Sequence, residues 1–174
     1  MEVTHLLALS DDLRIDQFTI MASALVLEVV STQLACCCPL CGQVTDHIHS
    51  RYWRVVADGP CGNRPVKLHV EVRKFFCRNT SCLRKVFTER LPDLLQPSAR
   101  MTNRLRSSLQ ALGLATGGEG SARLAPKLGM KAAPTTFLRY SRVEEETSTP
   151  QVRVVGVDDW AYKRGATYGT ILIE

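Results

Sequence analysis

The chain has 174 residues, of which 45% are hydrophobic, an ordinary fraction for a folded protein that excludes global disorder. A chain of this length can hold one medium domain or two to three small ones. The net charge of +5 conceals an asymmetry, because residues 1–35 carry −4, residues 36–142 carry +12 and residues 143–174 carry −3. A basic centre between acidic ends favours one polyanion-binding surface over a uniformly charged protein.

Neither a membrane span nor an export signal is predicted. The N-terminus lacks the positive region of a signal peptide, and the apolar run over residues 22–30 contains Glu28 and is too short to cross a bilayer. We therefore expect no membrane partner. Seven cysteines in such a chain are better explained by metal binding than by disulfides.

Residues 1–23 give little pattern and are taken as an N-terminal segment. Residues 24–92 contain four predicted strands, bounded by turn residues and rich in β-branched or alternating apolar residues, at 25–30, 49–57, 66–73 and 86–90. The clearest alternation is that over residues 66–73, which is typical of a half-buried strand. Residues 24–92 are therefore predicted to form a small antiparallel β domain with a thin core.

Two close cysteine pairs lie in this predicted domain, Cys38 with Cys41 and Cys77 with Cys82. Pairs about 35 residues apart can supply four thiolates to one tetrahedral metal ion. We predict that these four residues bind a structural zinc ion (Zn2+), and that the metal compensates for the thin core.

The alternative for the four cysteines is a set of buried thiols or an incidental disulfide. The adjacent Cys36 and Cys37 are spare thiols or alternative ligands, and Cys61 is expected to be free in a loop. His47 or His49 could replace one cysteine, although such histidines are more often surface or polar-network residues.

Beyond a linker marked by Pro92 and Pro97, the pattern becomes helical. Residues 97–143 contain three predicted helices: one capped by Ser98 and ended by the glycines at 117–118, one within 119–128, and one over 133–143 with Pro134 in its first turn. A helix, a short turn with glycine and a second helix are typical of a helix-turn-helix DNA-binding domain. A generic helical bundle is the alternative.

The basic centre supplies candidate DNA contacts. The last predicted helix would offer Thr135, Thr136, Arg139 and Arg142 on its exposed face. Further cations of the same block are candidate contacts: Arg84, Lys85, Arg123 and Lys127. A solvated charged face is the alternative, but neutralisation of several phosphates would make affinity fall steeply with salt.

Residues 144–151 are predicted to be a linker, and the following strand ends in Asp158 and Asp159. A second strand is predicted at 168–174. Because a two-stranded hairpin is not stable by itself, residues 152–174 are expected to begin a further domain that is incomplete here. Without other information, Asp158 and Asp159 are read as turn carboxylates.

From about residue 34 to residue 174, the chain resembles the N-terminal part of bacterial insertion-sequence transposases of the zinc-finger type that carry an acidic-triad (DDE) nuclease domain. The motifs that carry the resemblance are Cys-Pro-Leu-Cys-Gly at 38–42, His-Ser-Arg-Tyr at 49–52, Val-Arg-Lys-Phe-Phe-Cys at 72–77, Val-Phe-Thr-Glu-Arg-Leu-Pro at 86–92, Gly-Val-Asp-Asp-Trp-Ala-Tyr-Lys-Arg-Gly at 156–165 and Tyr-Gly-Thr-Ile-Leu-Ile-Glu at 168–174. The resemblance implies an α+β chain: a zinc-binding β domain, a three-helix helix-turn-helix domain that binds transposon ends, and the first hairpin of a truncated RNase-H-like α/β domain.

The resemblance also implies that Asp158 is the first catalytic carboxylate, with Mg2+ or Mn2+ bound only when the full catalytic domain is present. The implied partner is double-stranded DNA at the terminal inverted repeats, and a second copy of the chain is a further candidate partner. The implied location is the bacterial cytoplasm, in association with the nucleoid. Two hypotheses follow: the N-terminal or truncated form of a transposase, inactive alone, or a DNA-binding module that acts as a repressor or competitor at element ends.

Overall fold

The computed structural model describes residues 9–142, 156–163 and 165–173. They belong to two compact units, one up to Arg142 and the other after it, and each unit is described by itself. Within the described residues, no helix is long and apolar enough to span a membrane.

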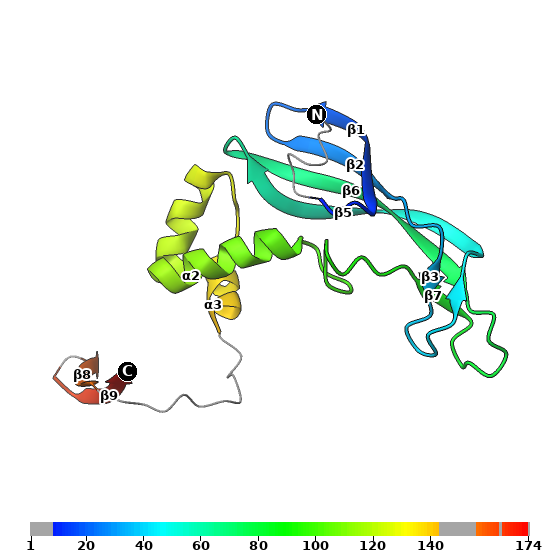
Figure 1. Cartoon of the computed structure of the whole chain (residues 1–174). Helices are drawn as coiled ribbons and strands as arrows, with labels where there is room; N and C mark the ends of the chain where they lie inside the picture. Colours follow the sequence, from blue (N-terminus) through cyan, green and yellow to red (C-terminus); the bar gives the residue numbers. More distant parts are fainter. Residues whose placement is uncertain (1–8, 143–155, 164, 174) are drawn as a thin grey trace. The chain divides into compact units, whose positions relative to one another are not determined.

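The first unit is built on a mixed five-stranded sheet (Figure 1), in which the order β1-β2-β6-β5 is extended by β7 on β6. β1 (Leu13–Ile20) and β2 (Leu25–Ser31) are antiparallel, as are β6 (Arg64–Phe76) and its neighbours β5 (Ile48–Cys61) and β7 (Val86–Thr88). β2 and β6 pair in parallel, so the prediction of a purely antiparallel domain is wrong. The reason is that β5 returns the chain along the sheet before β6 begins, which gives β6 the direction of β2.

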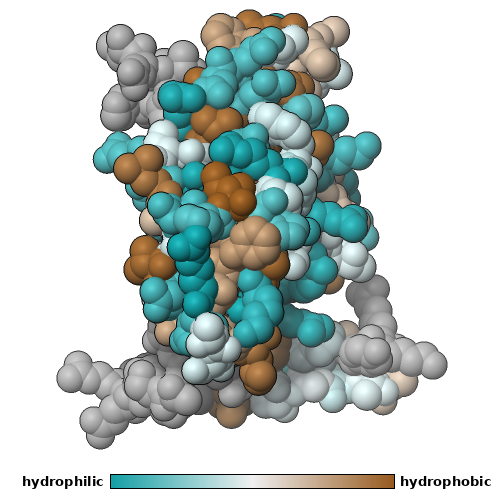
Figure 2. Space-filling model, turned by 90° about the vertical axis from the view of Figure 1, so that its right-hand side faces the viewer, coloured by the Kyte–Doolittle hydropathy of each residue, from teal (hydrophilic) through white to brown (hydrophobic). Residues whose placement is uncertain are grey.

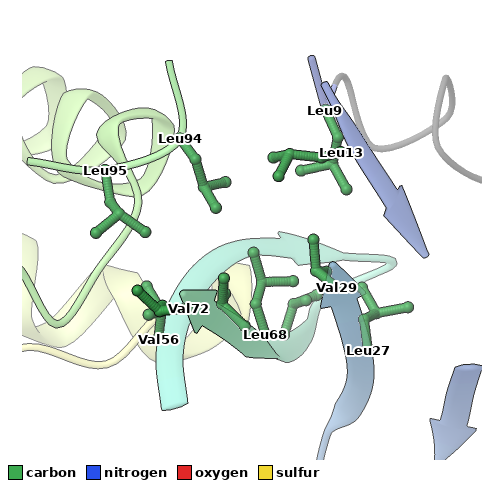
Figure 3. Packing of buried hydrophobic residues seen from close by; sticks show 11 residues of the cluster. Leu9, Leu13, Leu27, Val29, Val56, Leu68, Val72, Leu94 and Leu95 are labelled. Carbon is green, nitrogen blue, oxygen red and sulfur yellow. The ribbon is translucent and has the colours of Figure 1, made fainter. Parts of the chain in front are cut away.

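One face of this sheet carries the main hydrophobic core. Residues that alternate along β6 are fully or nearly buried, together with side chains of β2 and β5: Leu27, Val29, Val56, Val66, Leu68, Val70 and Val72. Figure 3 shows Leu94 and Leu95 lying over the same side of these strands as Leu9 and Leu13. Burial of each such side chain stabilises the fold by about 1.5–3 kcal/mol. Because side chains from the segments before β1 and after β7 add to those of the strands, this core is larger than the sequence indicated.

β1 lies in the N-terminal segment, for which no strand was predicted. A register shift between Ile15 and Gln17 marks a bulge, which brings Phe18 and Ile20 to the same face as Leu13 and Ile15 and so breaks the regular apolar alternation in the sequence. Phe18 and Ile20 lie opposite Leu27 and Leu25 but remain exposed, because β1 is the edge strand of the sheet. A single bulge is therefore sufficient to hide this strand from a period-2 pattern.

The prediction of a three-helix helix-turn-helix domain is wrong. Among the described residues there are two α-helices, α2 (Asn103–Leu124) and α3 (Pro134–Ser141), and one 3-10 turn, η1 (Ala125–Leu128); strands form most of the regular structure. Gly117, at φ +66° and ψ 179°, is non-helical and interrupts α2 at a kink, and the beginning of the predicted second helix forms the last part of α2 beyond this kink. Pro126 lacks a backbone N–H, and the remainder of that segment forms only the 3-10 turn.

The start of α2 also differs from the prediction. Ser98 has a positive φ of +63° and does not cap a helix; the N-cap is Thr102, whose side chain accepts a hydrogen bond from the backbone N–H of Leu105 at 3.3 Å. Buried Asp58 of β5 accepts hydrogen bonds from Thr102 Oγ1 at 2.7 Å and Arg104 Nε at 2.6 Å. These bonds attach the beginning of α2 to the sheet.

α3 packs tightly on α2. Phe137 is fully buried in a cluster with Leu105 and Leu109 of α2. A Cβ at Gly118 would lie 2.9 Å from the carbonyl oxygen of Pro134, so only glycine allows this approach. The exposed side of α3 is therefore the side opposite Phe137.

The second unit contributes a β-hairpin. β8 (Gly156–Lys163) pairs antiparallel with β9 (Thr167–Ile173), and Asp158 lies opposite Ile171. The predicted linker at 144–151 and the predicted strand residues 152–155 lie outside the described residues. The described part of this unit is a hairpin without a helix, and its assignment as the start of an RNase-H-like domain stays a prediction.

Candidate metal centre

Two tight turns bring the four predicted ligands together at the β7 end of the sheet (Figure 1). Cys38 directly follows β3 (Cys36–Cys37), and Cys41 lies in the turn that leads to β4 (Val44–Thr45). Within this turn the backbone N–H of Gly42 donates to the carbonyl of Cys38 at 2.9 Å, with Gly42 at φ +73°. Cys77 directly follows β6 and Cys82 precedes β7, so the pairing of β6 with β7 positions the second pair.

The sulfur atoms of Cys38, Cys41, Cys77 and Cys82 all lie within 4.8 Å of one another. The Cys38–Cys82 and Cys41–Cys77 sulfur separations are 4.0 Å and 3.6 Å. Tetrahedral zinc with Zn–S bonds of about 2.3 Å requires sulfur separations of roughly 3.8 Å. The four cysteines therefore fit one structural zinc ion, as the sequence predicts.

Backbone amides are directed at these sulfur atoms. Burial raises the pKa of Cys38, but the N–H groups of Leu40 and Cys41 and neighbouring thiols outweigh it and lower that pKa to about 7. Burial, followed by the neighbouring thiols, raises the pKa of Cys77 to about 12. Four adjacent thiolates repel one another, so a divalent cation is required to keep all four deprotonated.

The metal centre has its own small core, separate from the main one. Phe75 and Phe87 are buried behind the cysteines, with ring centroids 6.0 Å apart. The remaining members of this cluster are cysteines: Cys36, Cys38, Cys77 and Cys82. Because so few apolar residues pack here, the metal must supply much of the local stability. We call this part, residues 36–45 and 77–88, the ribbon end.

The alternative ligands lie outside the cysteine cluster. Cys36 Sγ lies 3.8 Å from a carboxylate oxygen of Glu89, and Cys37 and Cys61 are exposed. His47 Nδ1 lies 2.9 Å from Asp46, and His49 Nδ1 lies 2.9 Å from Ser50. In the part of the chain that the structure describes, the four cysteines are the only metal-binding cluster.

A buried ion pair that the sequence did not indicate lies next to the ribbon end. Arg73 donates from Nε and Nη2 to the two carboxylate oxygens of Glu89, at 2.9 Å and 2.5 Å. Arg73 also donates to the carbonyl of Gln33 at 2.7 Å and to Ser31 Oγ at 3.0 Å. Arg73 follows the polar alternation of its strand, so no sequence signal distinguishes it from an exposed residue. The pair joins β6 and β7 to the segment after β2.

The candidate DNA contacts are dispersed over the first unit. Arg84 and Lys85 are exposed between Cys82 and β7, and Lys85 Nζ donates to the carbonyl of Thr80 at 3.2 Å. The others lie on the helical segment and are exposed except for half-buried Thr136: Arg123, Lys127, Thr135, Thr136, Arg139 and Arg142. Arg84 and Arg139 each line a surface hollow. In Figure 2, hydrophilic and hydrophobic residues are interspersed on the face turned to the viewer.

Asp158 lies exposed on β8, and neighbouring Asp159 accepts a hydrogen bond from Thr170 Oγ1 at 2.9 Å. No group of three carboxylates or histidines that could hold a metal surrounds Asp158 within the described ranges. The structure therefore positions this residue on a strand but not in a carboxylate cage.

Comparison with known proteins identifies one region. A family model described as the zinc-finger of transposase IS204/IS1001/IS1096/IS1165 matches residues 35–82, which include all four cysteines. No curated protein and no solved structure matches the chain. Residues 35–82 are thus similar to a transposase zinc ribbon, which indicates an N-terminal zinc-binding region of the transposase type and a transposase-related role for the chain.

Proposed function

We propose that the chain is a transposase-like protein that binds duplex DNA at the terminal inverted repeats of an insertion element. The observation that carries this proposal is the transposase-type zinc ribbon at residues 35–82. Its four cysteines lie within residues 36–142, whose net charge is +12. A metal-stabilised module with such a charge suits the phosphate backbone of DNA.

Contacts to base edges are assigned to α3. Phe137 attaches one side of this helix to α2, which leaves Thr135 and Arg139 exposed to solvent. Arginine can donate two hydrogen bonds to guanine in the major groove. Arg84, in contrast, lines a surface hollow together with further cations and is proposed to contact phosphates.

Salt-sensitive binding of element-end duplex is the expected result. Fluorescence anisotropy with labelled end duplex and a scrambled duplex, over a series of salt concentrations, measures both affinity and sequence preference. Arg139→Ala is expected to reduce the preference for the end sequence by about 1–3 kcal/mol. Arg84→Ala is expected to weaken both duplexes equally and to reduce the salt slope by about one unit.

Arg14→Ala is the control, because Arg14 lies on β1 and pairs with Asp16 at 2.7 Å. Its affinity and salt slope are expected to equal those of the parent protein. If the affinity of the parent and of both variants depended neither on salt concentration nor on the DNA sequence, the proposed function would be contradicted.

We further propose Asp158 as the first carboxylate of a DDE catalytic site. Two-metal transfer of a phosphodiester needs several carboxylates, and the described residues do not assemble them around Asp158. The 174-residue chain is therefore expected not to cut end duplex with Mg2+ or Mn2+. Specific strand cleavage on a sequencing gel that disappears in Asp158→Ala would show that this expectation is wrong.

The lack of a carboxylate cluster around Asp158 in the described residues favours a second candidate function, a DNA-binding module that competes with a full transposase at element ends. Addition of this chain to a transposition assay is then expected to reduce the number of products. Undiminished transposition, at chain concentrations that saturate the end duplex, excludes this role.

A further inference from the structure

The first unit contains two neighbouring hollows that are both lined by cations. The larger, of about 840 Å³, lies on the sheet face that carries the core, beyond the core residues. Tyr52, Arg54 and Lys74 reach it from β5 and β6, because they have the same parity as the core residues of their strands. Arg84, which precedes β7 in the chain, and Arg90, which follows it, also line this hollow.

The only acidic residue that lines the larger hollow is Glu89. Both of its carboxylate oxygens accept hydrogen bonds from buried Arg73, which lies outside the lining. The charge of Glu89 is therefore neutralised within the fold, and four uncompensated cations remain in the lining: Arg54, Lys74, Arg84 and Arg90.

The smaller hollow, of about 370 Å³, lies between the start of α2 and α3. Arg100, Arg106 and Arg139 line it, and no acidic residue does. Gln96 and Ser98 line both hollows, so the two open on either side of one short segment. Together they extend from the ribbon end to the helices.

We propose that the two hollows form one continuous track for the phosphodiester backbone of duplex DNA, an inference that rests on the proposed function. We call this surface the cationic track and define it by six residues: Arg54, Lys74, Arg84, Arg90, Arg100 and Arg106. Arg139, which is assigned to base contacts, lines the smaller hollow at the end of the track. The track links the phosphate contact at the zinc ribbon with the base contact at α3 on one surface.

The aromatic residues of the track favour duplex over single-stranded DNA. Lys74 Nζ lies 5.3 Å from the ring centroid of Tyr52, and the guanidinium carbons of Arg106 and Arg139 lie 5.4 Å and 4.9 Å from that of Tyr140. Cations that cover the rings leave no open platform on which bases could stack, as single-strand binding requires. The same contacts hold the cations in the hollows, where they can meet phosphates.

Several track cations are free to bind an anion. Within the ranges that the structure describes, Arg84, Arg90 and Arg100 form no ion pair and no side-chain hydrogen bond. Arg54 differs, because its Nη2 donates to the carbonyl of Ala99 at 2.6 Å and supports the segment between the hollows. Arg84, Arg90 and Arg100 are therefore the positions for a test.

The test compares two triple variants with equal charge change, R84A/R90A/R100A on the track and R64A/K67A/K131A elsewhere. Arg64, Lys67 and Lys131 are exposed and line neither hollow, and Lys67 has the opposite parity to Lys74 on β6. The track variant is expected to lose about three units of salt slope and on the order of tenfold or more in affinity for labelled end duplex. The control variant is expected to retain parental values, and R84K/R90K/R100K to recover most of the loss.

A second measurement uses the unmodified chain. Arginines are modified with phenylglyoxal with and without duplex, and the sites are mapped by mass spectrometry. Protection of Arg84, Arg90 and Arg100, but not of Arg64, is expected. Equal protection of all four, equal losses in the two alanine variants, or tighter binding of single-stranded than of duplex probe would overturn the track while leaving DNA binding intact. A parent chain that binds no duplex would overturn the proposed function as well.

Discussion

Cys77→Ser is expected to abolish zinc binding and to unfold the ribbon end of the first unit. A serine hydroxyl is not a thiolate ligand, and three cysteines cannot close a tetrahedral structural site. Structural zinc sites contribute about 10–16 kcal/mol of apparent binding free energy in zinc-finger peptides, and little apolar packing replaces it here. Native mass spectrometry should find about one zinc per parent chain and none in the variant.

Hydrogen exchange locates the consequence. Amides of residues 36–45 and 77–88 are expected to lose protection in Cys77→Ser, whereas those of β2, within the separate main core, retain most of theirs. Cys61→Ser is the matched control, since Cys61 is exposed and lies outside the sulfur cluster. Retained zinc with unchanged exchange in Cys77→Ser would contradict the assignment of this ligand.

Glu89→Gln is expected to have the next largest effect, by removing one charge of a buried pair. The side chain of Glu89 is fully buried and that of Arg73 is 9% exposed, so the variant leaves an uncompensated buried guanidinium. Breaking such a pair costs about 3–5 kcal/mol of unfolding free energy. Urea unfolding of the zinc-loaded protein measures this difference.

The control for this variant is Glu71→Gln. Glu71 pairs with Arg51 at 2.9 Å on the surface, where the Arg51 side chain is 53% exposed. Surface pairs contribute about 0–1 kcal/mol, so the control is expected to remain close to the parent. Equal destabilisation by the two variants would show that the buried pair has no special role.

The pH dependence of this difference has a definite sign. Burial raises the pKa of Glu89, but the hydrogen bonds from Arg73 and Ser31 outweigh it and lower the pKa below its ordinary value of 4.5. The stabilisation by the carboxylate is thus fully present above pH 4.5 and is lost as the pH falls through the folded-state pKa. The difference in unfolding free energy between the parent and Glu89→Gln should be constant above pH 4.5 and become smaller below it.

The sequence was most informative where chemistry is local. Paired cysteines at short spacing identified all four metal ligands, and regular alternation identified β6. Both signals depend only on residue type and spacing. The bulge after Ile15 broke the same alternation and hid β1.

The helical segment shows where local signals fail. Gly117 was read as a helix end, and the backbone does leave helical geometry there, but the residues that follow form the last part of α2 and a 3-10 turn rather than a helix of the predicted length. Ser98 and Thr102 are both plausible caps by residue type, and the long-range hydrogen bond of Thr102 to Asp58 of β5 favours Thr102. A contact between residues so far apart in the chain cannot be detected from the pattern of a short sequence segment.

The cationic track and the buried Arg73–Glu89 pair also depend on tertiary structure. The sequence indicated a basic central block but did not separate cations that share a hollow from those on other faces. Strand parity and the pairing of β6 with β7 make that distinction, and neither pairing nor its register is visible in composition.

The zinc dependence of DNA affinity is the most direct test of a metal-stabilised DNA-binding surface. The backbone N–H of Arg84 is directed at the sulfur of Cys82, and the carbonyl of Lys85 accepts from the N–H of Cys77 at 2.8 Å, so zinc fixes the segment that carries Arg84. Anisotropy titrations of end duplex with zinc-loaded, chelator-treated and zinc-restored protein are to be compared. We expect chelation to lower both affinity and salt slope, as Cys77→Ser does, and zinc to restore them. Equal affinity of the zinc-free and zinc-loaded protein would contradict this function for the metal centre.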